Sequence, residues 1–186
     1  MKKRILIAAA LATAGFAGTA QAQDAAGTGA FVGLSGGYHD LGADTDDIAN
    51  ATGLDVNDGG AIYGVVAGVD FPLGQGNAFA GVEGNFHLGS GVIDSEYGVA
   101  ARLGMRTDGG AKFYVRGGYQ EVNIDPYNVV DVDVPAGTFD GLDDTSGDYL
   151  VGLGAEYPIG NAGLRFNVDT IAFDSVRGTV GVVFGF

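Results

Sequence analysis

The feature that most constrains this chain is an alternation of apolar residues with small or polar ones. A period of two places successive side chains on opposite faces of a β-strand. The alternation recurs in eight segments, which lie at positions 30–39, 61–71, 78–88, 95–106, 112–122, 148–157, 162–173 and 176–186. Each segment is about as long as a tilted strand that crosses a membrane. The pattern therefore predicts eight membrane-spanning strands and excludes a helical fold.

The connections between these segments alternate in length. The connections at 72–77, 107–111 and 158–161 are short and have the composition of hairpin turns, whereas 40–60 and 123–147 are long. An even number of antiparallel strands can close without leaving an unpaired edge. The sequence therefore predicts an all-β fold, an eight-stranded antiparallel up-and-down transmembrane β-barrel with short turns at one end.

The two faces of the expected strands differ in character. One is apolar, with aromatic residues near both strand ends, such as Tyr38 and Tyr149 toward the loops and Phe71 and Tyr157 toward the turns. The other combines glycines with charged residues, including five of the six Lys and Arg residues that follow position 4. A narrow lumen needs small residues and paired charges. We therefore expect the apolar face to contact lipid; the alternative is a water-soluble barrel with an apolar interior.

The first 22 residues have the composition of a secretory signal. Lys2, Lys3 and Arg4 precede an apolar stretch, and Ala20-Gln21-Ala22 has the small-residue pattern of a cleavage site. The alternative is a membrane anchor, but the apolar stretch is short for a spanning helix. We therefore expect a signal peptide at 1–22 and one outer-membrane β-barrel domain at 23–186.

The C-terminal stretch ends in an aromatic residue, with Val180, Val182, Phe184 and Phe186 on one face of the last expected strand. With segments such as 113–119, it resembles the small eight-stranded outer-membrane barrels of the OmpA/OmpX type from Gram-negative bacteria. The resemblance implies an integral outer-membrane location, contact with membrane lipids and lipopolysaccharide, and recognition of these four residues by the barrel assembly machinery. Many OmpA relatives continue into a periplasmic peptidoglycan-binding domain, whose function is not expected here because the sequence stops at Phe186.

Several charged residues of the polar face lie at similar heights on neighbouring strands. Glu83, Arg102 and Arg116 each lie four or five residues from the short turns, on three consecutive strands. Arg165 and Asp169, on the seventh strand, can reach them across the lumen. Because unpaired charges in a narrow interior are costly, we expect these five residues to form an ion cluster. The cluster either fills and stabilises the barrel or acts as a gate whose re-pairing opens a small conductance.

The expected loops hold most of the negative charge. The part of the chain after residue 22 has six Lys and Arg against 23 Asp and Glu, a net charge of −17, and 14 of these acids fall within 40–60 and 121–148. Such a chain is not expected to bind nucleic acid. The loops are either solvated surface or a site for divalent cations or surface ligands. A calcium loop that begins at Asp55 lacks its final glutamate, so we expect no specific metal site.

No catalytic site is expected. The two histidines, His39 and His87, lie near the outer strand ends, where we interpret them as interfacial or loop-capping residues. A hydrolase would need a histidine that is oriented by an acid and close to a serine, and Ser90 with Glu96 is the candidate set. His87 is expected to point inward, away from the lipid that such an enzyme would modify. The sequence also has no cysteine, and we expect no cofactor.

Three functions fit this pattern. The first is a structural role in the integrity of the cell envelope, with acidic loops at the surface. The second is a low-conductance, porin-like channel. The third is a surface adhesin or ligand-binding barrel that acts through its loops.

Overall fold

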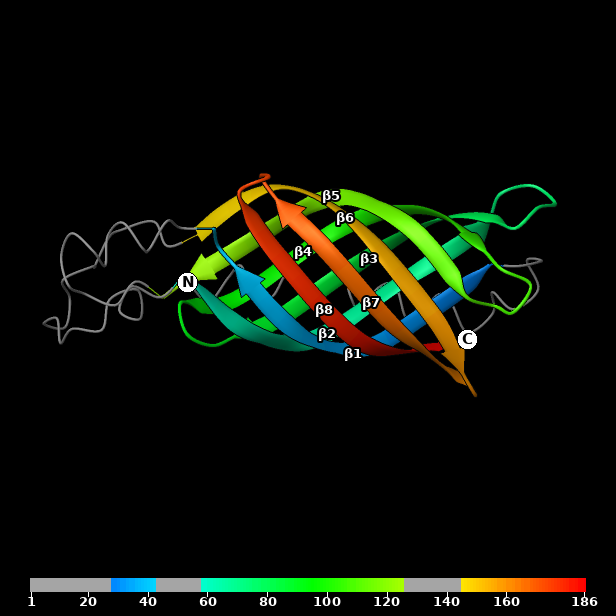
Figure 1. Cartoon of the computed structure of the whole chain (residues 1–186), viewed down its shortest axis with the longest axis horizontal. Helices are drawn as coiled ribbons and strands as arrows, with labels where there is room; N and C mark the ends of the chain where they lie inside the picture. Colours follow the sequence, from blue (N-terminus) through cyan, green and yellow to red (C-terminus); the bar gives the residue numbers. More distant parts are fainter. Residues whose placement is uncertain (1–27, 43–57, 126–144) are drawn as a thin grey trace, which may run out of the picture.

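The computed structural model describes residues 28–42, 58–125 and 145–186 and shows one closed barrel of eight strands (Figure 1). The predicted signal peptide at 1–22 and most of the two long loops lie outside these residues. The strands are β1 (Gly29–Asp40), β2 (Gly59–Pro72), β3 (Ala78–Gly89), β4 (Ile93–Arg106), β5 (Lys112–Ile124), β6 (Thr145–Ile159), β7 (Ala162–Ile171) and β8 (Ser175–Gly185). The predicted fold class is confirmed.

Every strand pairs antiparallel with its neighbours in the chain, and β8 closes the sheet against β1. In this closing seam His39 lies opposite Arg177, and Leu34 lies opposite Val182. The backbone hydrogen bonds from Ala30 to Phe186 and from Phe186 to Ala30 extend the seam to the last residue of the sequence. Because both edges are paired, the described strands leave no open sheet edge between β1 and β8.

Each of the three short turns contains a glycine with a positive φ angle. Gly74, Gly110 and Gly160 have φ values of 68°, 82° and 62°, one in each of the three short turns. Positive φ is readily accessible to glycine because it has no Cβ. The β7–β8 turn differs, since Ala172 and Phe173 adopt φ values of 56° and 64°. The predicted seventh strand, at 162–173, therefore ends two residues earlier, at Ile171.

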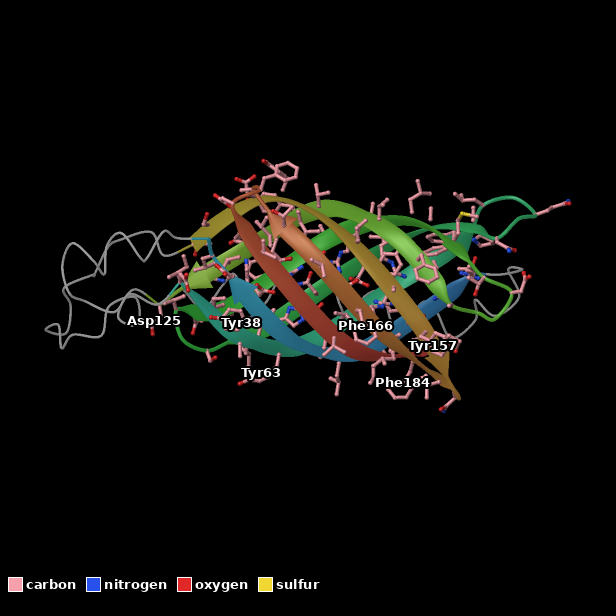
Figure 2. All side chains as sticks on the ribbon, in the orientation of Figure 1. Tyr38, Tyr63, Asp125, Tyr157, Phe166 and Phe184 are labelled. Carbon is pink, nitrogen blue, oxygen red and sulfur yellow. The ribbon has the colours of Figure 1, made fainter. Side chains whose placement is uncertain are left out.

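The apolar face of the strands points outward, as the alternation predicts. Large exposed hydrophobic side chains follow each strand, among them Leu34, Val65, Val99, Leu153 and Val168. Tyr38 and Tyr63 lie toward the loop end of the barrel, whereas Tyr157 and Phe184 lie toward the turn end (Figure 2). Among the described residues, no helix is long and apolar enough to cross a membrane.

The interior is filled by side chains. Near the loop end an apolar cap closes the lumen, formed by Ile62, Val92, Ile93 and Val122. Near the turn end Phe31, Val66 and Val183 form a second apolar cluster. Buried polar side chains lie along the lumen between these ends. Neighbouring strands leave no room for a side chain at Gly37, because a Cβ there would lie 1.9 Å from the carbonyl oxygen of Gly178.

Candidate functional site

The lumen contains a network of ion pairs, and strand alternation supplies its members. Five carboxylates and five cations point inward from β2 to β8 and form ten ion pairs, and these residues are Asp70, Glu83, Glu96, Glu156, Asp169, Arg102, Lys112, Arg116, Arg165 and Arg177. All except Lys112 and Glu156 are almost completely buried. The charges of these ten residues balance, which buried ions require.

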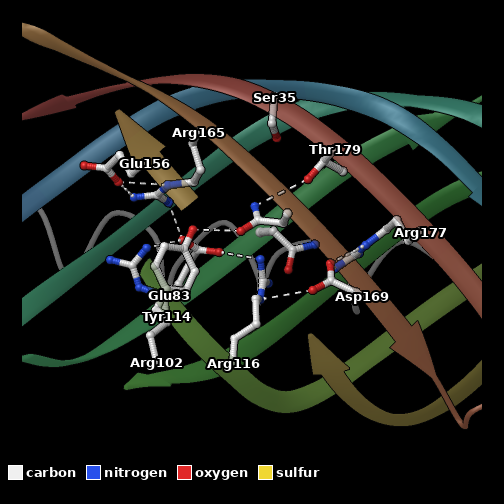
Figure 3. A network of polar contacts seen from close by, with 12 residues as sticks. Ser35, Glu83, Arg102, Tyr114, Arg116, Glu156, Arg165, Asp169, Arg177 and Thr179 are labelled. Atoms are coloured by element: carbon white, nitrogen blue, oxygen red, sulfur yellow. Dashed lines mark hydrogen bonds and ion pairs between the residues drawn. The ribbon is translucent and has the colours of Figure 1, made fainter. Parts of the chain in front are cut away.

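Glu83 on β3 is the centre of the inner part of the network (Figure 3). Its Oε2 accepts hydrogen bonds from Arg102 Nη1 at 3.2 Å and from Arg165 Nη1. Its Oε1 lies 3.1 Å from Arg116 Nη1. This last contact is an ion pair without hydrogen-bond geometry, since Oε1 accepts no hydrogen bond. One carboxylate therefore contacts guanidinium groups from β4, β5 and β7.

A second set of contacts ties the network to the turn end. Lys112 Nζ lies 3.0 Å from Asp70 Oδ2 and 3.0 Å from Glu156 Oε1. Glu156 Oε2 also accepts a hydrogen bond from Arg165 Nη2 at 2.6 Å. Arg102 donates to Asp70 as well. The inner half of the lumen is thus bridged across β2, β4, β5, β6 and β7.

Aromatic rings stack on the cations of this inner half. The guanidinium carbon of Arg165 lies 4.2 Å from the ring centre of Phe31, and that of Arg102 lies 4.5 Å from the same ring. Arg102 is also 4.7 Å from the ring centre of Tyr114. Cation–π attraction is stronger where water is excluded. Phe31 therefore helps the ion pairs to plug the inner lumen.

The outer half of the network has Arg177 on β8 at its centre. Its Nε and Nη2 donate to Asp169 Oδ2 at 3.1 and 2.9 Å, and its Nη1 donates to Glu96 Oε1 at 2.6 Å. Asp169 Oδ1 lies 3.5 Å from Arg116 Nε, which joins the outer half to the inner half. The two halves are therefore continuous through Asp169 and Arg116.

Both histidines belong to this outer half. His39 Nδ1 lies 2.7 Å from Glu96 Oε2, and His87 Nδ1 lies 3.1 Å from Glu96 Oε1. The interpretation of these residues as interfacial or loop-capping is wrong, because both are buried in the lumen. Ser90, the serine considered with His87, instead donates its hydroxyl hydrogen bond to the carbonyl of Ala61.

The structure brings together the five residues that the sequence places in an ion cluster. Glu83 contacts Arg102, Arg116 and Arg165, and Asp169 contacts Arg116. The predicted cluster lacks Asp70, Lys112 and Glu156, although alternation alone places all three on the inward face. Phe31 is likewise absent from the predicted cluster, because its contact with the arginines arises only across the closed lumen.

The arrangement is suited to filling space and holding the wall together. Four buried polar atoms of the ten-residue network make no hydrogen bond within the described part of the chain, and these are Glu83 Oε1, Arg102 Nε, Arg116 Nε and Asp169 Oδ1. Among the five cations of the network, Arg116 is the one whose carboxylate contacts both lack hydrogen-bond geometry. The described residues contain no group of three His, Cys, Asp or Glu side chains that could hold a metal ion.

Comparisons with known proteins bear on the fold. No family model matches the sequence, and no curated protein matches it. The N-terminal β-barrel domain of Pseudomonas aeruginosa OprF is similar in structure, with 14% identity, coverage of 86% of this chain and 97% of that chain, and a TM-score of 0.50.

Two other solved structures are more distantly similar in geometry. Ail, the attachment invasion locus protein of Yersinia pestis, has 14% identity, coverage of 86% and 97%, and a TM-score of 0.46. Neisserial surface protein A has 12% identity, coverage of 84% and 97%, and a TM-score of 0.46. The likeness to the OprF domain confirms the predicted resemblance at the level of the fold: the chain has the architecture of the small eight-stranded outer-membrane barrels.

Proposed function

We propose that this chain is an integral outer-membrane barrel whose first role is structural, as a filled barrel that contributes to the integrity of a Gram-negative envelope. The observation that carries the proposal is the distribution of charge across the wall. On the eight described strands, the outward charged side chain farthest from a strand end is Glu121, near the loop end of β5, where it accepts a hydrogen bond from Tyr97, whereas ten charged residues pair inside. Lipid favours an apolar outer surface, and closure of the sheet gives the backbone N–H and C=O groups of its edge strands hydrogen-bond partners.

The proposed partners follow from this surface. The outward side chains would contact membrane lipids and the acyl chains of lipopolysaccharide, and the last strand would be read by the barrel assembly machinery. All six Lys and Arg residues after position 4 lie on β4, β5, β7 or β8, so the long loops contribute only negative charge. Contact between these loops and anionic headgroups would therefore depend on divalent cations.

Localisation and deletion together test the structural role. In fractionated cells, the protein should be found with the outer membrane and should float with phospholipid vesicles after refolding. A deletion strain should become more sensitive to detergent, and the wild-type gene should restore resistance. Recovery of the protein in the soluble fraction would contradict the proposal, as would a deletion strain with unchanged envelope permeability.

A low-conductance channel is the second candidate, and the loose contacts of Arg116 favour it. Arg116 lies 3.1 Å from Glu83 and 3.5 Å from Asp169 without hydrogen-bond geometry to either carboxylate oxygen. A change of partner by this residue would open space in the middle of the lumen. Planar-bilayer recordings of the wild type and of Glu83→Ala test the gate, because identical single-channel traces would count against it.

Ligand binding through the acidic loops stays a prediction. The segments 43–57 and 126–144 lie outside the described residues, so the structure offers no contact on which to build a site. Complementation of the deletion strain with a variant that lacks 126–144 separates the two roles. Restored detergent resistance with loss of surface attachment would favour an adhesin.

A further inference from the structure

The outer lumen contains an arrangement that the structural role does not require. Glu96 on β4 receives three side chains from other strands, which are His39 from β1, His87 from β3 and Arg177 from β8. Glu96 and His39 are completely buried, and Arg177 and His87 are nearly so. His39 and Arg177 are direct partners across the seam between the first and last strands. Glu96 therefore reaches across the lumen and holds both sides of the seam.

Proton positions within this cluster follow from the partners. A carboxylate only accepts hydrogen bonds, so Nδ1 of each histidine carries hydrogen when it bonds to Glu96; His87 Nδ1 also lies 3.4 Å from Asn85 Nδ2, a longer contact than the 3.1 Å to Glu96. His39 Nε2 lies 3.3 Å from Ser175 Oγ, and His87 Nε2 lies 2.7 Å from Ser35 Oγ. A hydroxyl can donate or accept. Each Nε2 can therefore be bare or protonated while every heavy atom stays in place.

The hydroxyl of Ser175 has a second acceptor besides His39. Its hydroxyl lies 3.1 Å from the carbonyl oxygen of Ile171, to which it can donate. When His39 is neutral, Ser175 can donate to Nε2, and when His39 is charged, Ser175 can accept from Nε2 and donate to Ile171. The hydrogen bonds of Ser175 are thus satisfied in either protonation state of His39.

The effect of a proton on either histidine depends on the charges that surround it. The ten charged residues of the network already balance, so a proton on either histidine adds positive charge that no further carboxylate in the network offsets. The groups that face the histidines are Glu96 on β4, Asp169 on β7 and Arg177 on β8, while the inward neighbours on β2, β5 and β6 are the uncharged Gly60, Gly64, Gln120 and Leu150. Asp148, half-buried on β6, accepts from the backbone of Tyr149.

A charged His39 would lie directly opposite Arg177 in the seam and would share Glu96 with it, while Asp169 stays paired with Arg177. Like charges that face each other across paired strands destabilise the pairing. Repulsion is larger where water is excluded. Proton uptake should therefore weaken the hold of Glu96 on Arg177.

A hydrolytic role for the same groups fits less well. Ser175, His39 and Glu96 are connected in the order of a nucleophile, a base and an orienting acid. Only 6% of the Ser175 surface is exposed, and the apolar cap of Ile62, Val92, Ile93 and Val122 closes the same end of the lumen. Within the described part of the chain, the hydroxyl is therefore largely shielded from a substrate carbonyl.

We propose that His39, His87 and Glu96 form a proton-operated latch on the closing seam of the barrel. With neutral histidines, Glu96 holds Arg177 and the outer end of the β1–β8 seam is fixed. Proton uptake adds positive charge beside Arg177 and loosens that end. The latch is independent of the proposed envelope role, because it needs only the folded barrel.

Hydrogen exchange of the full chain, refolded in micelles, tests the latch. Protection factors for 36–40 and 176–180 would be compared with those of the β5–β6 pairing as an internal reference, at about pH 7.5 and about pH 5.5. At the lower pH, protection at the seam should fall roughly tenfold relative to the reference. The double variant His39→Gln/His87→Gln, which keeps polar side chains without the charge, should show no such fall. An equal ratio at both pH values in the wild type, or the same fall in the double variant, would overturn the proposal.

Two further variants guard against a misfolded double variant. Glu96→Gln removes the shared carboxylate, so the seam should be poorly protected at both pH values, and wild-type protection at neutral pH would also overturn the latch. Because the sequence has no cysteine, Leu34→Cys/Val182→Cys can introduce a single cross-link between direct seam partners. The cross-linked barrel should lose the pH response, and reduction of the disulfide should restore it.

Discussion

At the scale of single residues, Glu83 is the carboxylate on which most arginines of the inner network converge. Its side chain is buried and lies within ion-pair distance of three arginines from three strands. Removal of one member of a buried ion pair leaves its partner uncompensated, which costs more than the pair contributes when intact. The stability of the filled lumen should therefore be sensitive to this one carboxylate.

We expect Glu83→Gln to lower the free energy of unfolding by about 3–5 kcal/mol, because three guanidinium groups would then face a neutral amide. Urea titration of the refolded barrel in phospholipid vesicles measures the change. Asp108→Asn, in the exposed turn between β4 and β5, makes the same chemical change away from the network and should leave stability nearly unchanged. Equal stabilities for the two variants would show that the ion pairs do not support the barrel.

At the scale of elements, the β7–β8 hairpin is the strained connection. Ala172 and Phe173 both have positive φ, a conformation that hairpin turns of this kind normally assign to glycine or asparagine. The surroundings hold the turn, since the Tyr149 hydroxyl donates to the Ala172 carbonyl at 3.0 Å and the rings of Tyr149 and Phe173 lie 5.3 Å apart. Contacts with β6 therefore compensate for an unfavourable turn sequence.

Ala172→Gly should raise the free energy of unfolding by about 1 kcal/mol, because glycine adopts positive φ without the steric penalty of a Cβ. The backbone hydrogen bonds with Tyr149 do not depend on the side chain that is removed. Ala101→Gly, in the middle of β4, should instead lower stability by roughly 0.5–1 kcal/mol. If both changes destabilise the barrel equally in urea titration, the turn is not strained.

At the scale of the whole molecule, the barrel reverses the usual arrangement of a water-soluble protein, with its paired charges inside and its hydrophobic side chains outside. Val99 lies midway along β4 and is 54% exposed, whereas Leu88 lies at the outer end of β3. The cost of a charge on the outer surface should thus depend on height along the barrel. A water-soluble barrel would show no such dependence.

Val99→Arg should lower the free energy of unfolding in phospholipid vesicles by about 2–4 kcal/mol, the cost of a charge near the middle of a bilayer. Leu88→Arg should cost about 0–1 kcal/mol, because its side chain can reach the interface. The same urea titration measures both variants. Equal effects would contradict lipid contact at the outer face.

The sequence by itself determined the strands, their number and the two faces, because a period of two is a local property that each strand carries on its own. It also placed Glu83, Arg102 and Arg116 at one height, since consecutive hairpins keep neighbouring strands in register. The histidines show the limit of that argument. Alternation directs His39 and His87 inward, but does not say which side chain meets them.

Only the tertiary structure decided the contacts that cross the lumen. Closure of β8 against β1 sets His39 beside Arg177, and the curvature of the wall brings both to Glu96, which is 57 residues from His39 in the chain. The inner plug arises in the same way, because Phe31 on β1 meets Arg165 on β7 only when the sheet is closed. Pairing between neighbouring strands follows from local pattern, whereas contact across a barrel depends on its closure and shear.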